Sequence, residues 1–131
     1  GRQDRYSVLH GWSWVIDVKT ARSAAAGPFS RQVAQDGYHE QAAFYLDGLE
    51  AIAPQERRFL WIVVEKDAPH CVALYEPTAQ TLGEGRVRYR RHLDLHLQCE
   101  ATGAWPGYPD GIEPLHLPRW AQTEADWPDE E

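Results

Sequence analysis

The sequence lacks methionine, has only two cysteines among its 131 residues, and contains no apolar run long enough to cross a membrane. Nothing at the start of the chain resembles a signal peptide, so we expect a cytoplasmic protein with no membrane contact. Cys71 and Cys99 form no CxxC pair, which disfavours both a zinc ribbon and a disulfide framework; two buried free thiols are expected. The missing initiator methionine favours a piece of a longer protein.

Basic residues are scarce: 13 lysines and arginines stand against 20 acidic residues, for a net charge of −7. This balance argues against non-specific nucleic-acid binding through bulk charge, although it leaves room for a local basic patch. The apolar fraction of 43% and the charged fraction of 25% are ordinary for a soluble globular protein. We therefore expect residues 1–121 to form a single domain and residues 122–131 to form an acidic, disordered tail.

The periodicity of the apolar residues predicts six elements, in the order ββαββα. They are two strands over Arg5–Leu9 and Trp12–Val18, a helix from Ser30 to about Ile52, two strands over Phe59–Val64 and His70–Tyr75, and a helix from Thr78 to about Glu100. A loop ending at Gly27-Pro28 precedes the first helix, and Thr78 is the expected N-cap of the second. The continuous apolar run Phe59–Val64 predicts a strand that is covered on both faces. This order fits an α/β fold around a mixed sheet.

An acidic and basic cluster on the first two strands suggests a metal site. Asp17 and Lys19 are two residues apart on a strand, so both side chains point to the same face. If the hairpin is centred on His10-Gly11, Asp4 lies opposite Asp17. Like charges placed in this way are destabilising, so the two carboxylates make most sense around a divalent cation. The adjacent lysine makes such a site look catalytic.

Carboxylate oxygens suit Mg²⁺ or Mn²⁺, and Mg²⁺ often completes its shell with water and substrate phosphate, which favours phosphate-ester chemistry. Lys19 would then orient or deprotonate the attacking water, or stabilise the charge of the transition state. Gln41 and Tyr45 are four residues apart and therefore share one helix face, from which they could support the site. Arg22 and Arg31 are candidates for phosphate contacts with DNA.

Each of these patterns also has a purely structural interpretation. Asp17 and Lys19 could form a surface ion pair of little energetic value, and Gln41 and Tyr45 could belong to an ordinary helix face. The second helix carries Arg86, Arg90 and Arg91, which we interpret as a solvated surface. His92 and His96 are spaced like metal ligands, but no third ligand is apparent, so we interpret them as structural.

Taken together, the motifs are similar to those of the RecE-type exonucleases (exodeoxyribonuclease VIII), members of the PD-(D/E)xK nuclease superfamily. The segments that carry the resemblance are Arg2-Gln3-Asp4-Arg5, Ile16-Asp17-Val18-Lys19-Thr20, Tyr38-His39-Glu40-Gln41-Ala42-Ala43-Phe44-Tyr45, Trp105-Pro106 and Leu117-Pro118-Arg119-Trp120-Ala121. Glutamine stands at position 3, where the family pattern has proline. The resemblance implies a restriction-endonuclease-like core, with a central mixed β-sheet flanked by helices. It also implies helices and a metal-site histidine upstream of Gly1.

The function that the resemblance implies is a Mg²⁺-dependent exonuclease that degrades linear double-stranded DNA from 5′ to 3′ for recombination. Asp4 and Asp17 would bind the metal, with the Val18 carbonyl as a possible third ligand. Lys19 would orient the water, while Gln41 and Tyr45 would support the site. The implied partners are duplex DNA ends, further copies of the chain in a ring and a single-strand annealing protein.

Two other functions stay open at this point. An endonuclease or a RecB/Cas4-like nuclease of the same superfamily would carry the same cluster, because end specificity comes from oligomeric geometry and upstream elements. A non-catalytic, truncated module that binds DNA or forms oligomers is the alternative from a different class. Loss of cleavage on substituting Lys19 separates the nucleases from the module.

Overall fold

The computed structural model describes residues 6–9 and 11–123. Along the chain, the elements are β1 (Tyr6–Leu9), β2 (Trp12–Ala21), α1 (Ala26–Asp36), α2 (Tyr38–Ile52), β3 (Arg57–Glu65), β4 (Val72–Tyr75), α3 (Ala79–Thr102) and a short 3₁₀ helix, Arg119–Ala121. All the predicted strands are present, each with boundaries close to the expected ones.

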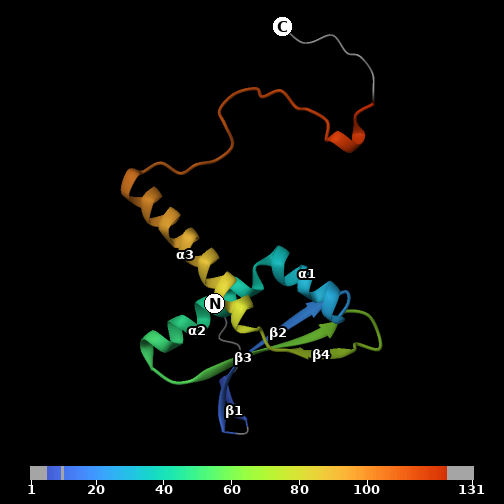
Figure 1. Ribbon diagram of the computed structural model, residues 1–131, viewed down its shortest axis with the longest axis vertical. Coiled ribbons are helices and arrows are strands. Elements are labelled where there is room, and N and C mark those ends of the chain that lie inside the picture. Colours follow the sequence, from blue (N-terminus) through green and yellow to red (C-terminus); the bar gives the residue numbers. More distant parts are fainter. Residues whose placement is uncertain (1–5, 10, 124–131) are drawn as a thin grey trace.

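The strands form one mixed sheet in the order β1-β2-β3-β4. The outer pairs, β1 with β2 and β3 with β4, are antiparallel, whereas β2 and β3 run parallel. Parallel neighbours need a long crossover connection, and α1 and α2 together provide it. The predicted α/β organisation around a mixed sheet is therefore confirmed (Figure 1).

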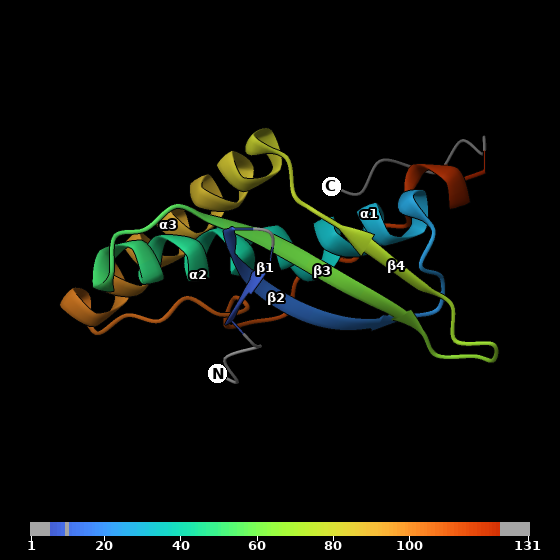
Figure 2. The ribbon, with the colours of Figure 1, turned by 90° about the horizontal axis from the view of Figure 1, so that it is seen from below.

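The core lies between one face of the sheet and the helices. Along β2 and β3, alternate residues point to this face, and most of them are buried. They pack against α1 and α2, while α3 packs on the outside of α2 (Figure 2). The buried apolar cluster comprises Val15, Ala21, Ala24, Phe29, Val33, Ala42, Leu46, Phe59, Trp61 and Val63.

The opposite face of the sheet is more open than the sequence predicts. In the part of the chain that the structure describes, all three long helices lie on the core side, so β3 is not covered on both faces (Figures 1 and 2). The side chains of Val18, Val72 and Leu74 on this second face are 56%, 59% and 61% exposed. The apolar run of β3 therefore reflects its central position in the sheet rather than two covered faces.

The first predicted helix is in fact two helices. Gly37 adopts the left-handed conformation, with φ of 70°, and separates α1 from α2. A glycine has no Cβ to oppose this conformation, so the chain changes direction here at little cost. The first helix also begins earlier than expected, at Ala26. Pro28 falls in its first turn, where the missing N–H group of proline is tolerated.

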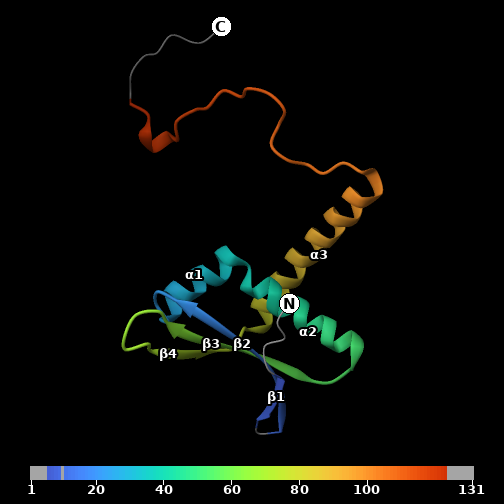
Figure 3. The same ribbon diagram turned by 180° about the vertical axis from the view of Figure 1, so that it is seen from behind.

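The last predicted helix is confirmed, and Thr78 caps it by accepting a hydrogen bond from the Thr81 amide at 3.1 Å. Figure 3 shows that the far end of α3 projects beyond the sheet and that the chain then continues as an extended segment. Both cysteines are free, but only Cys99 is buried. The prediction is wrong for Cys71, which is exposed just before β4. Within the described residues, no helix is long and apolar enough to span a membrane.

Candidate active site

The ammonium group of Lys19 is the centre of a compact polar cluster. Its Nζ atom lies 2.9 Å from Asp17 Oδ2 and donates a hydrogen bond to Gln41 Oε1, also at 2.9 Å. The same atom lies 4.1 Å from the centre of the Tyr38 ring. Three different groups that attract a cation therefore surround this lysine.

The strand β2 brings the two charged residues together on the core side of the sheet. Residues of β2 alternate between faces, and Asp17 and Lys19 share the face that carries the buried Val15 and Ala21. The side chains of Asp17 and Lys19 are only 3% and 16% exposed. A buried ion pair loses hydration and depends on close geometry, so this is not the solvated surface pair of the structural interpretation.

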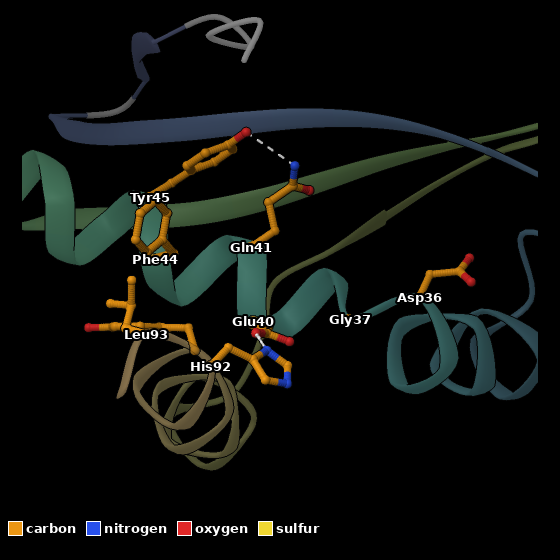
Figure 4. A pocket seen from close by; sticks show the side chains of 9 residues that line it. Asp36, Gly37, Glu40, Gln41, Phe44, Tyr45, His92 and Leu93 are labelled. Atoms are coloured by element: carbon orange, nitrogen blue, oxygen red, sulfur yellow. Dashed lines mark hydrogen bonds and ion pairs between the residues drawn. The ribbon is translucent and has the colours of Figure 1, made fainter. Parts of the chain in front are cut away.

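The helix α2 supplies the other side of the cluster. Tyr38, Gln41 and Tyr45 are spaced by three and four residues and lie on one helix face. The Gln41 Nε2 group donates a hydrogen bond to the Tyr45 hydroxyl at 3.1 Å (Figure 4). The amide of Gln41 therefore joins Lys19 on one side to Tyr45 on the other, and its orientation is fixed by both.

Tyr38 was not among the predicted site residues. It begins the motif that contains Gln41 and Tyr45, but an aromatic residue at the start of an amphipathic helix more often marks the core. Its hydroxyl accepts a hydrogen bond from Gln32 Nε2 at 3.2 Å, which helps to hold the ring against Lys19. The contact between its ring and Lys19, rather than its spacing in the sequence, identifies Tyr38 as a site residue.

The remaining predicted site residues do not join the described cluster. Asp4 lies outside the described residues, although the pairs Tyr6–Val15 and Ser7–Trp14 have the register that the predicted hairpin requires. The Val18 side chain points to the open face, and its backbone pairs with Ile62. Arg22 and Arg31 are exposed and take no part in the hydrogen bonds around Lys19. The described residues contain no group of three side chains suited to hold a metal.

The family model for the PDDEXK-like domain of unknown function (DUF3799) matches residues 5–118. The chain belongs to this family. A search of curated proteins found no match. Membership in a PDDEXK-like family supports the predicted nuclease superfamily and fits the α/β fold around a mixed sheet.

A hollow of about 540 Å³ opens beside the cluster of this PDDEXK-like domain, between α2 and α3. Gln41 and Tyr45 form its inner wall on the side of the sheet, as Figure 4 shows. The other large side chains that line it are Phe44, Tyr89, His92 and Leu93. The hollow and the Lys19 cluster therefore share two residues.

A second polar cluster, separate from that of Lys19, fixes α3 to α2. It corrects the expectation that Arg86 belongs to a solvated surface. Arg86 donates hydrogen bonds to both carboxylate oxygens of Asp47, at 2.9 and 3.0 Å, so it is not simply a solvated residue. The Tyr89 hydroxyl donates to the same carboxylate at 2.6 Å. Burial alone would raise the pKa of Asp47, but the hydrogen bonds from Arg86 and Tyr89 outweigh it and lower the pKa.

The two histidines on α3 have separate partners. His92 Nδ1 contacts the carboxylate of Glu40 on α2, and His96 lies near Glu100 in its own helix. Arg88 lies 3.6 Å from the same Glu40 carboxylate. The described contacts of His92 thus hold α3 against α2, in line with the structural interpretation of these histidines.

Proposed function

We propose that this domain is a metal-dependent deoxyribonuclease that hydrolyses phosphodiester bonds, and that its preferred substrate is the end of linear duplex DNA. The observation that carries the proposal is the buried contact between Asp17 and Lys19, extended by Gln41 and Tyr45, in a member of a PDDEXK-like family. A chain that kept only the fold would have no evident need for a lysine held on three sides beneath a helix.

The donor chemistry of the cluster fits a hard divalent cation. Asp17 offers carboxylate oxygens at the inner end of the site, and the proposed ligand set adds Asp4 and the Val18 carbonyl. Mg²⁺ commonly keeps several waters and uses only one or two carboxylates together with substrate phosphate, so a small protein ligand set suffices. When bound, Mg²⁺ or Mn²⁺ would polarise the phosphoryl group and lower the pKa of a coordinated water.

The other residues of the cluster would act on the phosphate and the water. Lys19 would orient the attacking water and offset negative charge on the phosphoryl oxygens as the bond to the leaving oxygen breaks. Gln41 would hold the Lys19 ammonium in place, since its carbonyl oxygen accepts the hydrogen bond from Nζ. Tyr45 would fix Gln41 in turn by accepting from Nε2, so the reactive group needs little rearrangement before the reaction.

The finer assignment follows the order of the RecE-like motifs along the chain. On that basis we propose 5′-to-3′ digestion that leaves a 3′ overhang for recombination. The same resemblance suggests that several copies form a ring around DNA and that a single-strand annealing protein receives the product. Arg22 and Arg31 are proposed to contact DNA phosphates, since both are exposed, Arg22 directly after β2 and Arg31 in the middle of α1.

A digestion assay tests the proposal. The protein is incubated with linear and with covalently closed circular duplex DNA, each with Mg²⁺ and with EDTA. We expect metal-dependent loss of the linear DNA alone, with a label at the 5′ end released first. Cutting of the circle would instead identify an endonuclease, such as a RecB/Cas4-like enzyme.

Lysine substitutions provide the matched control, because Lys19 and Lys66 are the only lysines in the sequence. Lys19→Ala should abolish cleavage while Mn²⁺ binding, followed by electron paramagnetic resonance, persists. Lys66→Ala removes an exposed lysine and should cleave like the unchanged protein. Full cleavage by Lys19→Ala would refute the mechanism, and a wild-type protein that cuts neither DNA would favour the non-catalytic module.

A further inference from the structure

We propose that the hollow between α2 and α3 binds a nucleobase of the DNA strand that is cut at Lys19. The inference rests on the proposed nuclease activity and adds a second contact for the same substrate. The hollow is defined by Gln41, Phe44, Tyr45, Tyr89, His92 and Leu93. Three features support this assignment: the continuity of the hollow with the Lys19 cluster, the character of its walls and the charges of its lining residues.

Continuity with the cluster comes from a single amide. Gln41 accepts the hydrogen bond from Lys19 through Oε1 and also lines the hollow. Tyr45, its hydrogen-bond partner, lies on the same wall (Figure 4). A nucleotide that places its phosphate at Lys19 therefore meets the hollow directly beyond Gln41. The base is the part of a nucleotide that extends away from the phosphate, and its flat faces stack on aromatic side chains.

The walls suit a flat aromatic ligand. Phe44 and Leu93 are large apolar residues that line the hollow, and they are 48% and 44% exposed. The Phe44 ring packs edge-on against Tyr89, with centroids 5.4 Å apart and an interplanar angle of 78°, so its position is fixed. Aromatic side chains held in this way stack well on nucleobases of any sequence.

The charges of the lining residues favour an uncharged base over a phosphate. Glu40 and the exposed Asp36 both line the hollow, and a phosphate placed there would be repelled. Glu40 already contacts His92 and lies 3.6 Å from Arg88, so both of these side chains are engaged by a carboxylate. The side chain of His92 is 60% exposed, and its imidazole would offer a hydrogen bond to a polar edge of a base.

Methyl-detected NMR of the whole chain tests the inference without cleavage. Protein with ¹³C-labelled leucine methyl groups is titrated in EDTA with deoxyadenosine monophosphate and, separately, with inorganic phosphate. We expect the nucleotide to shift the Leu93 methyl signals through the ring current of the base. Leu74 is the control, because it is 61% exposed on the open face of the sheet and should not shift. Inorganic phosphate should leave Leu93 unchanged.

A conservative substitution then isolates the aromatic wall. Phe44→Leu keeps an apolar side chain but removes the ring. The Kd for the nucleotide, fitted from the Leu93 shifts, should rise at least tenfold. In the cleavage assay, the same variant should raise KM and change kcat little, because the hydrogen bond and ion pair that hold Lys19 come from Gln41 and Asp17 and not from Phe44.

The outcomes separate this inference from the proposed function. If the protein degrades DNA but the nucleotide leaves Leu93 unmoved, or if phosphate alone moves it, the inference is overturned and the nuclease stands. If the nucleotide shifts Leu93 but no DNA is cut, the nucleobase site stands and the proposed function fails. Equal affinity of Phe44→Leu and wild type for the nucleotide would also overturn the inference.

Discussion

Gly85 lies where α3 comes closest to α2, and replacing it by alanine should force the two helices apart. A Cβ atom at this position would lie 2.2 Å from the carbonyl oxygen of His39 and 2.7 Å from its carbonyl carbon, whereas ordinary contacts begin near 3.4 Å. Both atoms belong to the backbone and cannot rotate away. The helices must therefore separate by about 1 Å, and overpacking of this kind typically costs about 1–3 kcal/mol.

Gly83 provides a matched control within the same helix. A Cβ added there would meet no atom within 4 Å, so only the helical preference of alanine acts. Replacing an interior helical glycine by alanine should stabilise the fold by about 0.5–1 kcal/mol. Both variants gain this helical preference, so their free energies of unfolding should differ by the overpacking cost alone, about 1–3 kcal/mol, with Gly85→Ala the less stable.

Urea unfolding followed by tryptophan fluorescence measures both variants, since the chain contains six tryptophans. We expect the midpoint to rise for Gly83→Ala and to fall for Gly85→Ala, with similar slopes. The clash should also disturb the candidate site, because the backbone of His39 that it displaces is two residues from Gln41. A rise in stability for Gly85→Ala as large as that for Gly83→Ala would refute the close approach of the two helices.

Two further predictions concern stability. Asp47→Asn should lower the free energy of unfolding by about 1 kcal/mol at pH 7. Because folding lowers the pKa of Asp47, its contribution is complete above the ordinary value of 3.8 and is lost as the pH falls through the folded value. Urea titrations at neutral pH and in acid should show the difference from wild type shrinking, and a constant difference would contradict this. Phe29→Ala removes a ring that is 3% exposed and stacks on Tyr75. It should cost about 3–5 kcal/mol in the same assay, and Phe29→Leu less; a loss under about 1 kcal/mol would contradict the packing.

The parts of the site that follow from local spacing could be predicted from the sequence. Asp17 and Lys19 share a face because strand residues alternate, and Gln41 and Tyr45 share a face because a helix turns every 3.6 residues. The contact between Lys19 and Gln41 joins residues 22 positions apart, and no periodicity encodes it. Helix spacing makes Gln41 and Tyr45 candidates to support the site, and the resemblance to the RecE-type motifs groups them with Asp17 and Lys19.

The errors have physical causes of the same kind. The apolar pattern continues across Gly37, so a single helix was expected where the left-handed glycine divides two. Pro28 was interpreted as a break, although the first turn of a helix accepts proline. The ring of Tyr38 lies against Lys19, and this contact depends on how closely α2 packs on β2. The spacing of the two elements is set by the volumes of many core side chains at once, which a motif does not specify.

The crossover that makes β2 and β3 parallel also confines the cluster to one stretch of chain. Asp17, Lys19, Gln41 and Tyr45 all lie on β2 and α2, before the chain enters β3. The later elements β3 and α3 pack against β2 and α2, but they add nothing to the described contacts of Lys19. Insertions or deletions after α3 could therefore accumulate during evolution without moving the cluster. A domain built in this way can change the elements that surround the cluster while it keeps the cluster itself.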